Sequence, residues 1–510
     1  MDRPSTIAAL SDRSAWGGAD MRVCTTHISA VFLEGNDAWK LKKPVNYGFV
    51  DYSTLERRRF FCEQEVTLNR PRAPGVYLGV EPVRMTSDGP RIGVEAGEIV
   101  DWAVHMKRLP DDATLSAHLE RGDVERGLFE RIGADLARVH AHAERGPHIA
   151  RYGARDVILG NVDENFRQGE PEVGVSVSRE VTTRLEALQR SAIDAASDLI
   201  AARVAASVPC DTHGDLRLEH VYLLDDEVAF VDCIEFNDRF RYADPVADLA
   251  FLYMDLAVRG YRAEADALAH SWVATSGDRA GLALLPFYTS YRSSVRGKIA
   301  GFRLRDPSLD AASRTAARAR SRRHWLFALA ELAPPAERPG LVAIGGLPGV
   351  GKSTLARALA EAAGFEVIRT DAVRKQAGAV SYAQQAKDDV YAACLGLAED
   401  ALFHGKRVIL DAGFWHRSHR DAVFDLARRL GVPCLFLGCE ADPAVVRARL
   451  QARTGDASDA DVHIYEQALR EWEPDQGRLV AIDTRQDGLS QALAALDAHF
   501  AGGSRTLSTT

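Results

Sequence analysis

The sequence predicts an α+β domain followed by an α/β domain that is built on a parallel sheet. Residues 20–105 are rich in strand-like runs and hold one helical stretch, whereas residues 111–335 are mostly helical with a short strand-rich stretch at 208–236. After residue 340, apolar strand-like runs alternate with helical patterns. This alternation indicates parallel strands joined by helices that cover both faces of a sheet.

The composition is typical of a soluble protein with two or three domains. With 510 residues the chain is too long for one hydrophobic core, and 46% of the residues are apolar and 26% charged. A formal net charge of -9 provides no overall attraction to nucleic acid or anionic lipid. Seven cysteines without a CxxC pair argue against a zinc site or a disulfide framework. Because no apolar run resembles a signal peptide or a membrane span, we expect a cytoplasmic protein.

A proline-rich segment, residues 334–340, marks the domain boundary. Its three prolines end the preceding helix, and a buried strand-like run follows at once. We therefore expect a first domain at 1–333, with a small lobe at about 20–105 and a large lobe at about 111–333. The second domain is expected at 341–500, followed by a flexible tail at 501–510. A small β-rich lobe before a larger helical lobe is the layout of bilobal kinase-like folds.

The small lobe contains candidate phosphate-binding lysines. Residues 38–42 are predicted to form a strand, on which Lys40 and Lys42 share a face, so either could contact phosphate. Residues 53–56 have the pattern of a capping box that opens a helix through Asn69. On that helix, Glu65 or Glu63 is the expected partner of the lysine.

Two carboxylates in the predicted large lobe suit metal-assisted phosphoryl transfer. Asp215 lies in the segment His213–His220, and Asp232 follows a predicted strand, Val228–Val231. One carboxylate could accept the proton of a hydroxyl acceptor while the other binds Mg²⁺ on ATP.

This segment resembles the loop HGDxxxxN of the aminoglycoside phosphotransferase and choline kinase superfamily. The resemblance covers roughly residues 20–300 and implies that Asp215 is the catalytic base and Asp232 a metal ligand. Where the superfamily has a metal-binding asparagine, this chain has His220. Mg²⁺ prefers oxygen ligands, so an altered metal preference or a domain that only binds its ligand are alternatives to catalysis.

The second domain contains five predicted strands with helices between them. One such helix, STLARALAEAAG, ends at Gly364. The predicted strands are Leu341–Ile344, Glu366–Ile368, Arg407–Leu410, Cys434–Leu437 and Leu479–Ile482.

A glycine-rich motif between the first strand and its helix fits the pattern G-x-x-x-x-G-K-[ST]. Glycines let backbone amides surround phosphates, and the helix N-terminus adds its positive dipole. Lys352 could reach the β- and γ-phosphates of ATP and Ser353 could hold Mg²⁺. The predicted nucleotide-binding residues are Gly346, Leu347, Pro348, Gly349, Val350, Gly351, Lys352, Ser353 and Thr354.

Further charged residues follow the other predicted strands. Asp371 could deprotonate an acceptor hydroxyl or merely cap the next helix, and Arg374, one turn later, could hold an anionic substrate. Asp411 ends a strand, where it could act on the Mg²⁺ shell or on the substrate. Arg449 and Arg453 share a helix face and could close over the transferred phosphoryl group as a lid, or could form a solvated surface.

Residues 340–500 resemble the P-loop kinases related to polynucleotide 5′-kinases, gluconate kinases and zeta-type toxins. By that resemblance Asp371 is the general base, Arg374 a substrate clamp, and Arg449 with Arg453 the lid. The order of the two domains is similar to that of bacterial proteins described as bifunctional aminoglycoside phosphotransferase/ATP-binding proteins.

The resemblance implies an ATP- and Mg²⁺-dependent phosphotransferase with two nucleotide-binding domains and a hydroxyl-bearing acceptor. The alternatives are a polynucleotide 5′-hydroxyl kinase and a nucleotide-binding regulatory protein whose first domain is not catalytic. Nucleic acid is a less favoured acceptor because the net charge is negative. No membrane association is expected, and the sequence contains no indication of an oligomeric state.

Overall fold

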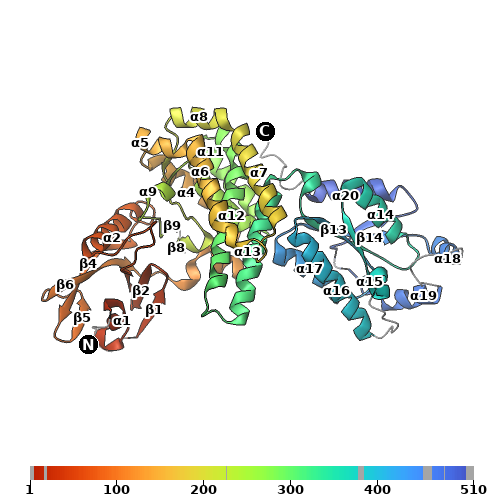
Figure 1. The fold of residues 1–510 in the computed structure, drawn as a ribbon, viewed down its shortest axis with the longest axis horizontal. Coiled ribbons are helices and arrows are strands. Elements are labelled where there is room, and N and C mark those ends of the chain that lie inside the picture. The colour runs from red at the N-terminus through yellow and green to blue at the C-terminus, as the bar shows by residue number, and fades with distance from the viewer. Residues whose placement is uncertain are drawn as a thin grey trace. The chain divides into compact units, whose positions relative to one another are not determined.

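The computed structural model separates by its internal contacts into two compact units (Figure 1). It describes residues 5–16, 20–224, 227–376, 384–451, 462–475 and 477–500. The first unit contains residues 1–158, 197–256 and 262–285, and the second contains residues 159–196, 257–261 and 286–510. None of the helices in the described part of the chain has the length and apolar character that crossing a membrane requires.

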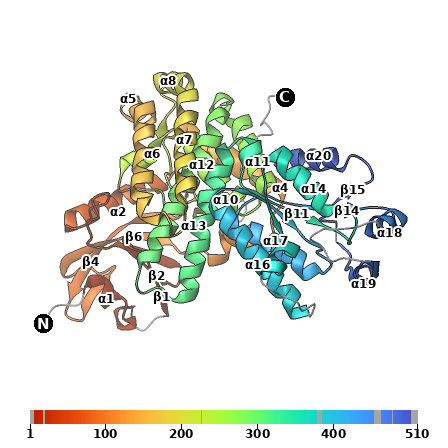
Figure 2. The same cartoon turned by 45° about the vertical axis from the view of Figure 1, so that its right-hand side comes forward.

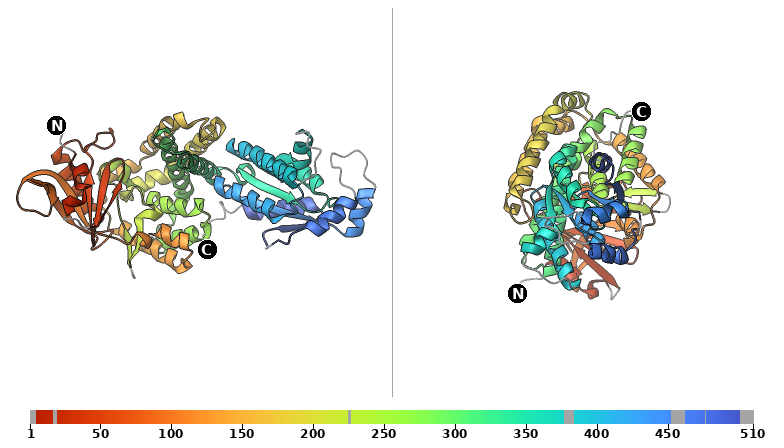
Figure 3. Two further views of the ribbon diagram at one scale, coloured as in Figure 1. Left: turned by 90° about the horizontal axis from the view of Figure 1, so that it is seen from below. Right: turned by 90° about the vertical axis from the view of Figure 1, so that its right-hand side faces the viewer.

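The first unit contains a six-stranded antiparallel sheet with the order β1-β2-β3-β6-β4-β5 (Figure 3, left). Its strands are β1 (Met21–Thr25), β2 (Ser29–Glu34), β3 (Asp37–Lys42), β4 (Tyr77–Thr86), β5 (Gly89–Ile92) and β6 (Glu98–Lys107). These strands confirm the prediction that residues 20–105 are strand-rich.

Helix α2 (Leu55–Asn69) packs against β4 and β6, and it ends at the predicted residue. Its start differs from the prediction, because the cap is Thr54, whose side chain accepts the amide of Arg57. The Ser53 hydroxyl instead donates to Asp51 Oδ1 at 2.6 Å. Because Thr54 is the cap, the predicted capping box between Ser53 and Glu56 does not form.

The two faces of the sheet pack against different elements. Cys62 and Val66 of α2 form one core cluster with Val104 of the sheet. On the other face, Leu10 of the short helix α1 (Thr6–Leu10) forms a cluster with Leu41 of β3. Since side chains alternate along a strand, Lys40 and Lys42 lie on the face opposite Leu41, which is the face that α2 covers.

The rest of the first unit is mostly helical, as predicted, with two short strand pairs. Strand β8 (Val221–Leu224) pairs with β9 (Glu227–Phe230), and β7 (Cys210–Asp211) pairs with β10 (Tyr242–Ala243). The helices are α3 (Leu115–Arg121), α4 (Arg126–His142), α5 (Pro147–Ala150), α8 (Ser197–Ala205), α9 (Asp238–Arg241), α10 (Val246–Val258) and α11 (Arg262–Ser276).

A buried carboxylate of α10 holds the backbone of the segment that begins at His213. Asp248 accepts the amides of His213 at 2.6 Å and Gly214 at 2.9 Å, and the imidazole of His140 at 3.3 Å. Burial alone would raise the pKa of Asp248, but the bond from His140 and the amide of His213 lower it well below 3.8. Asp255, two turns later on α10, accepts the amide of Leu218 at 3.1 Å.

The second unit contains a parallel five-stranded sheet with the order β12-β13-β11-β14-β15. The strands are β11 (Gly340–Gly345), β12 (Glu366–Arg369), β13 (Arg407–Asp411), β14 (Cys434–Glu440) and β15 (Val480–Asp483), which confirms the five predicted strands. Helices α14 (Lys352–Ala363) and α20 (Gly488–Phe500) cover one face, and α16 (Gln384–Phe403) and α17 (Arg417–Leu430) cover the other (Figure 2). The short helices α15 (Thr370–Gln376), α18 (Pro443–Gln451) and α19 (Val462–Glu471) follow three of the strands.

Four long helices belong to the same unit as this sheet. They are α6 (Arg155–Gly169), whose first residues lie in the first unit, α7 (Arg179–Ala195), α12 (Leu285–Phe302) and α13 (Ala311–Leu332). Arg184 of α7 donates to the carbonyls of Gly405 at 3.0 Å and Glu337 at 3.1 Å. Arg407 donates to the carbonyl of Ala336 at 2.6 Å. The carbonyls of the proline-rich segment therefore accept hydrogen bonds from one arginine that precedes it in sequence, Arg184, and one that follows it, Arg407.

Gly405 provides a test of this helix contact. Its φ is +72°, and a Cβ atom there would lie 3.0 Å from Val181 Cγ2 and 3.2 Å from Leu329 Cδ2. Gly364 has nearly the same φ, +69°, with nothing within 4 Å. We expect Gly364→Ala to cost about 1 kcal/mol for the left-handed backbone, and Gly405→Ala to cost roughly 1 kcal/mol more because the added methyl group also meets α7 and α13. Thermal unfolding midpoints measure both changes, and equal losses would contradict the contact.

Asp248→Asn is expected to destabilise the first unit by about 3 kcal/mol, because an amide cannot accept from both backbone N–H groups. Since folding lowers the pKa of Asp248, the carboxylate stabilises the fold fully above 3.8 and progressively less as the pH falls below that value. The difference in unfolding free energy between wild type and variant should therefore shrink in acid. Asp88→Asn, in the exposed turn between β4 and β5, serves as the control. If this difference does not change with pH, the Asp248 carboxylate does not hold the backbone of His213 and Gly214 in the way described.

Candidate functional site

The loop between β11 and α14 is built around three glycines. Gly346, Gly349 and Gly351 have φ values of +138°, +78° and +100°, which strongly favour glycine. A Cβ atom at Gly346 would lie 2.6 Å from the carbonyl oxygen of Cys439. Lys352, the first residue of α14, donates to the carbonyl of Leu347 at 2.8 Å. The predicted motif therefore has the strand–loop–helix geometry that binds phosphates.

This loop lines a cavity of about 900 Å³ at the carboxyl edge of the parallel sheet. Lys352, Ser353 and Thr354 contribute to its wall, together with Arg449 and Thr484, which follow β14 and β15. Other lining residues lie at or after the ends of β12 and β13, on the other side of β11, and include Asp371, Asp411, Ala412, Gly413, Trp415 and His416. The sheet order thus gives the cavity two ends. The phosphate-loop end lies toward β14 and β15, and the second end lies toward β12 and β13.

The predicted metal ligands of this cavity lie close to one guanidinium. Arg369, at the end of β12, donates to Ser353 Oγ and to Asp411 Oδ2, each at 3.1 Å. A hydroxyl and a carboxylate are the oxygen donors that Mg²⁺ prefers, so these two residues fit that ion. In the present arrangement, Arg369 supplies positive charge beside Asp411.

The predicted base and clamp form an ion pair, with Asp371 Oδ1 lying 3.3 Å from Arg374 Nη2. Both residues line the cavity. Arg449 lies 3.5 Å from the carbonyl of Val350 and from Thr484 Oγ1, so one predicted lid residue reaches the phosphate loop. Arg453, the other predicted lid residue, lies outside the described residues, as does the predicted tail at 501–510.

The segment after Asp411 forms a wall of the cavity that the sequence did not reveal. Phe414 has a φ of +54°, which is strained for a bulky residue. Its amide donates to the Tyr391 hydroxyl at 2.9 Å, and its carbonyl accepts from the buried Arg420 at 2.7 Å. These contacts hold the strained backbone and so place Trp415 and His416 in the cavity wall.

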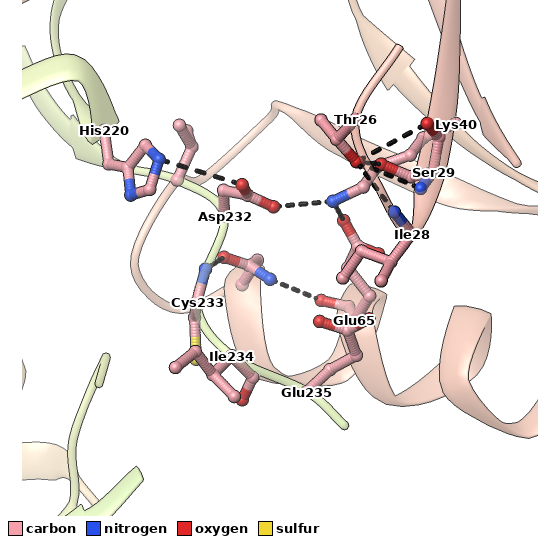
Figure 4. Close-up of polar contacts among 12 residues, drawn as sticks. Thr26, Ile28, Ser29, Lys40, Glu65, His220, Asp232, Cys233, Ile234 and Glu235 are labelled. Carbon is pink, nitrogen blue, oxygen red and sulfur yellow. Dashed lines mark hydrogen bonds and ion pairs between the residues drawn. The ribbon is translucent and has the colours of Figure 1, made fainter. Parts of the chain in front are cut away.

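A second cluster of charges lies in the first unit, where α2, β3 and the segment after β9 meet (Figure 4). Glu65, which is fully buried, accepts from Lys40 at 2.7 Å and from Lys42 at 2.8 Å. Lys40 also donates to Asp232 at 2.6 Å, whereas Lys42 is paired with Glu235. Glu235 accepts the Tyr52 hydroxyl at 2.5 Å. Lysines and carboxylates therefore alternate along one chain of ion pairs.

These contacts distinguish the alternatives that the sequence left open. The Lys42 side chain is 1% exposed and has its own partner in Glu235, whereas Lys40 is 13% exposed and lies beside Asp232. Lys40 is therefore the better placed of the two lysines to contact a phosphate. Glu65 pairs with both lysines, whereas Glu63 pairs with Arg59 at the surface.

Asp232 has a φ of +65°, outside the usual range for a residue with a side chain. Its amide donates to the Tyr77 hydroxyl at 3.0 Å. Partial removal from water would raise its pKa, but the charges of Lys40 and His220 lower it well below the ordinary value. Burial would likewise lower the pKa of Lys40, but Asp232 and Glu65 raise it well above its ordinary value. The pair is therefore fully charged near neutral pH.

The predicted base of this cluster also has a cationic partner. Arg217 Nε donates to Asp215 Oδ2 at 3.0 Å, and Arg217 Nη2 lies 2.8 Å from His220 Nε2. The other ring nitrogen of His220 donates to the carbonyl of Asp215 at 2.8 Å. Both nitrogens of His220 are thus engaged within the protein, and Nε2 lies 3.8 Å from Asp232 Oδ2.

This donor set does not fit a divalent metal ion in the arrangement described. Binding at His220 Nε2 would displace the Arg217 contact and bring the ion next to a permanent positive charge. One oxygen of Asp232 is already bonded to Lys40. In the described part of the chain, no cluster of three or more His, Cys, Asp or Glu side chains could hold a metal ion.

Several of the residues that shape these sites were not predicted. Arg369 directly precedes Thr370-Asp371, and Arg217 lies two residues after Asp215, so closeness in sequence to a predicted carboxylate was the available signal. Glu235 lies three residues after Asp232. Trp415 and His416 had no sequence signal, because their role depends on the backbone turn at Phe414.

Two protein-family models match separate parts of the chain. The phosphotransferase enzyme family (APH) matches residues 95–285, and an AAA domain family (AAA_33) matches residues 341–474. Among solved structures, a gluconokinase from Sinorhizobium meliloti is 26% identical with a TM-score of 0.26, covering 31% of this chain and 93% of its own. A sugar kinase from a Janibacter species is 20% identical with a TM-score of 0.27, covering 32% of this chain and 97% of its own.

Relatives that extend over nearly the whole chain occur in mycobacteria. An uncharacterized protein of Mycobacterium tuberculosis is 31% identical over 507 residues, which is 96% of this chain and 98% of that protein. A Mycobacterium bovis protein matches with the same identity and coverage. The chain therefore belongs to the same family as these mycobacterial proteins, and in this chain an APH phosphotransferase domain is followed by a P-loop kinase domain.

Proposed function

We propose that the protein is an ATP-dependent phosphotransferase whose P-loop domain transfers the γ-phosphoryl group of ATP to a hydroxyl acceptor. One observation carries this proposal. The glycine loop, Lys352, Ser353, Asp371 and Asp411 all line a single cavity, which has room beyond the phosphate loop for an acceptor.

In the proposed reaction, the oxygen of the acceptor hydroxyl attacks the γ-phosphorus. The bond from the γ-phosphorus to its bridging oxygen breaks, and ADP leaves with that electron pair. Asp371 takes the proton of the hydroxyl, and Lys352 and Arg449 hold the phosphates from the loop side. A magnesium ion held by Ser353 and Asp411 would neutralise charge on the phosphates. For this to happen, the guanidinium of Arg369 has to leave these two side chains.

A second candidate role concerns the first unit, for which we propose nucleotide binding without catalysis. Lys40 and Glu65 have the positions expected for contact with a phosphate. Asp215 is paired with Arg217, as Asp371 is with Arg374, so this pairing does not distinguish the two sites. The first unit differs at the predicted metal position, because both ring nitrogens of His220 are engaged, by Arg217 and by the carbonyl of Asp215. This arrangement favours a regulatory role for the first unit over a second phosphotransferase centre.

Lys352→Ala is expected to remove ATP turnover and to weaken nucleotide binding at the P-loop by at least about tenfold, because the phosphates lose a charged partner. Lys406→Ala removes an exposed lysine of the same unit, paired with Glu366, and should change neither quantity. Titration with a fluorescent ATP analogue measures the binding. Nucleotide binding that remains in Lys352→Ala is assigned to the first unit and should be lost on adding Lys40→Met. Full turnover by Lys352→Ala would refute the proposed function.

Asp371→Asn is expected to lower phosphoryl transfer by about 10² to 10⁴-fold while ATP affinity stays within about twofold, because the amide cannot take the hydroxyl proton. ADP release is measured with a set of sugars, nucleosides and a 5′-hydroxyl oligonucleotide as acceptors. Asp425→Asn, which removes an exposed carboxylate paired with Arg428, is the matched control. Unchanged turnover by Asp371→Asn would show that Asp371 is not the base. Transfer to the oligonucleotide only would favour a polynucleotide kinase.

A further inference from the structure

The second end of the P-loop cavity contains more positive charge than the binding of an uncharged hydroxyl group requires. Among the described residues, five cationic and two anionic side chains line the cavity, namely Lys352, Arg357, Arg374, Lys387 and Arg449 against Asp371 and Asp411. Lys352 and Arg449 lie at the phosphate loop, where a nucleotide would use their charge. Arg374 lies on α15 and pairs with Asp371, the predicted base, and Lys387 lies on α16 in the wall of the same cavity.

Lys387 is held in the wall without a short ion pair. Its ammonium lies 3.7 Å from Glu471 Oε2 and 5.3 Å from the centre of the Trp415 ring, and the side chain is 26% exposed. An ammonium at this distance from a single carboxylate is only partly neutralised and retains donors for a ligand. The aromatic ring fixes the direction of the lysine side chain.

Two polar atoms of the same wall lack protein partners. Trp415 Nε1 and His416 Nε2 are buried and have no hydrogen-bond partner. Such orphaned atoms are costly in a folded protein, and they recur where a ligand or water completes the bonding. Both belong to the segment whose backbone is strained at Phe414 and held by Tyr391 and Arg420.

Several hydrogen bonds hold the backbone of the strained segment, residues 414–416, in place. Arg420 is 1% exposed and donates to four carbonyl oxygens, those of Phe414, Trp415, Glu473 and Pro474, between 2.7 and 3.3 Å. The amide of Glu473 donates back to the carbonyl of Trp415 at 3.0 Å. Strain that is over-determined in this way is typical of a binding site.

We infer that this end of the cavity binds a small hydroxylated acceptor that carries its own carboxylate or phosphate group. Lys387 and Arg374 neutralise that anion, and Trp415 and His416 donate or share hydrogen bonds with its oxygen atoms. The acceptor hydroxyl then faces Asp371. This inference rests on the proposed phosphotransferase function and adds the chemical class of its acceptor.

Binding is measured without catalysis, so that the two ideas can fail separately. The full chain is loaded with Mg²⁺ and the non-hydrolysable analogue AMP-PNP, and dissociation constants are determined for two matched series. The first is glucose, glucuronate and glucose 6-phosphate; the second is ribose, ribonate and ribose 5-phosphate. A 5′-hydroxyl oligonucleotide is tested in parallel.

We expect an anionic member of at least one series to bind at least tenfold more tightly than its neutral member. Lys387→Met should reduce this preference to about twofold, and Trp415→Phe, which removes only the indole N–H, should weaken the anionic member about threefold to tenfold. The matched controls Lys406→Met and Trp472→Phe should keep the preference, because neither residue lines the cavity.

The inference is overturned if neutral members bind as well as anionic ones, if no member of either series binds, or if only the oligonucleotide binds. It is also overturned if Lys387→Met keeps the full preference while the variant unfolds at the wild-type temperature. A compound that binds as expected but yields no ADP release with ATP would leave the acceptor class intact and would refute the proposed phosphotransferase function instead.

Discussion

A charge removed from water needs a partner of opposite charge, and this constraint organises the first unit. Glu65 is fully buried on α2, and its two oxygens bond to Lys40 and Lys42 of β3. Breaking one partner from such a set costs several kcal/mol, because the other charge stays buried. Lys40 and Lys42 also pair with Asp232 and Glu235, so these ion pairs join helix α2, strand β3 and the segment after β9. The position of Lys40 beside Asp232 follows from this arrangement.

Arginine has the same role at both candidate sites, which lie in different folds. Arg369 bridges Ser353 and Asp411 in the P-loop cavity. Arg217 bridges Asp215 and His220 in the first unit. In the cavity the bridged groups are oxygen donors that suit Mg²⁺, so the guanidinium can give way to the metal ion. In the first unit one bridged group is an imidazole with both nitrogens engaged, so among the described residues this bridge suits Mg²⁺ less well than the one in the cavity.

Both sites also contain a strained residue that is held by a tyrosine. The amide of Asp232, at φ +65°, donates to the Tyr77 hydroxyl, and that of Phe414, at φ +54°, donates to the Tyr391 hydroxyl. A left-handed backbone at a residue with a side chain costs of order 1 kcal/mol or more and persists only where its surroundings enforce it. In each case the turn directs a functional segment toward its site, the carboxylate of Asp232 in one and the 415–416 wall in the other.

The sequence by itself determined those features of the protein that depend only on residues close to one another in the chain. The glycine motif around Lys352, the five parallel strands and the carboxylates at or just after the ends of two of them were predictable, because short-range spacing dictates a strand, a tight turn and a helix. The choice between Lys40 and Lys42 was not predictable, since alternation places both on one face of β3. Only the tertiary structure distinguishes the two lysines, by bringing Asp232 to Lys40 and Glu235 to Lys42 across nearly 200 residues of chain. Contacts of that kind depend on how distant segments pack, and no local pattern records them.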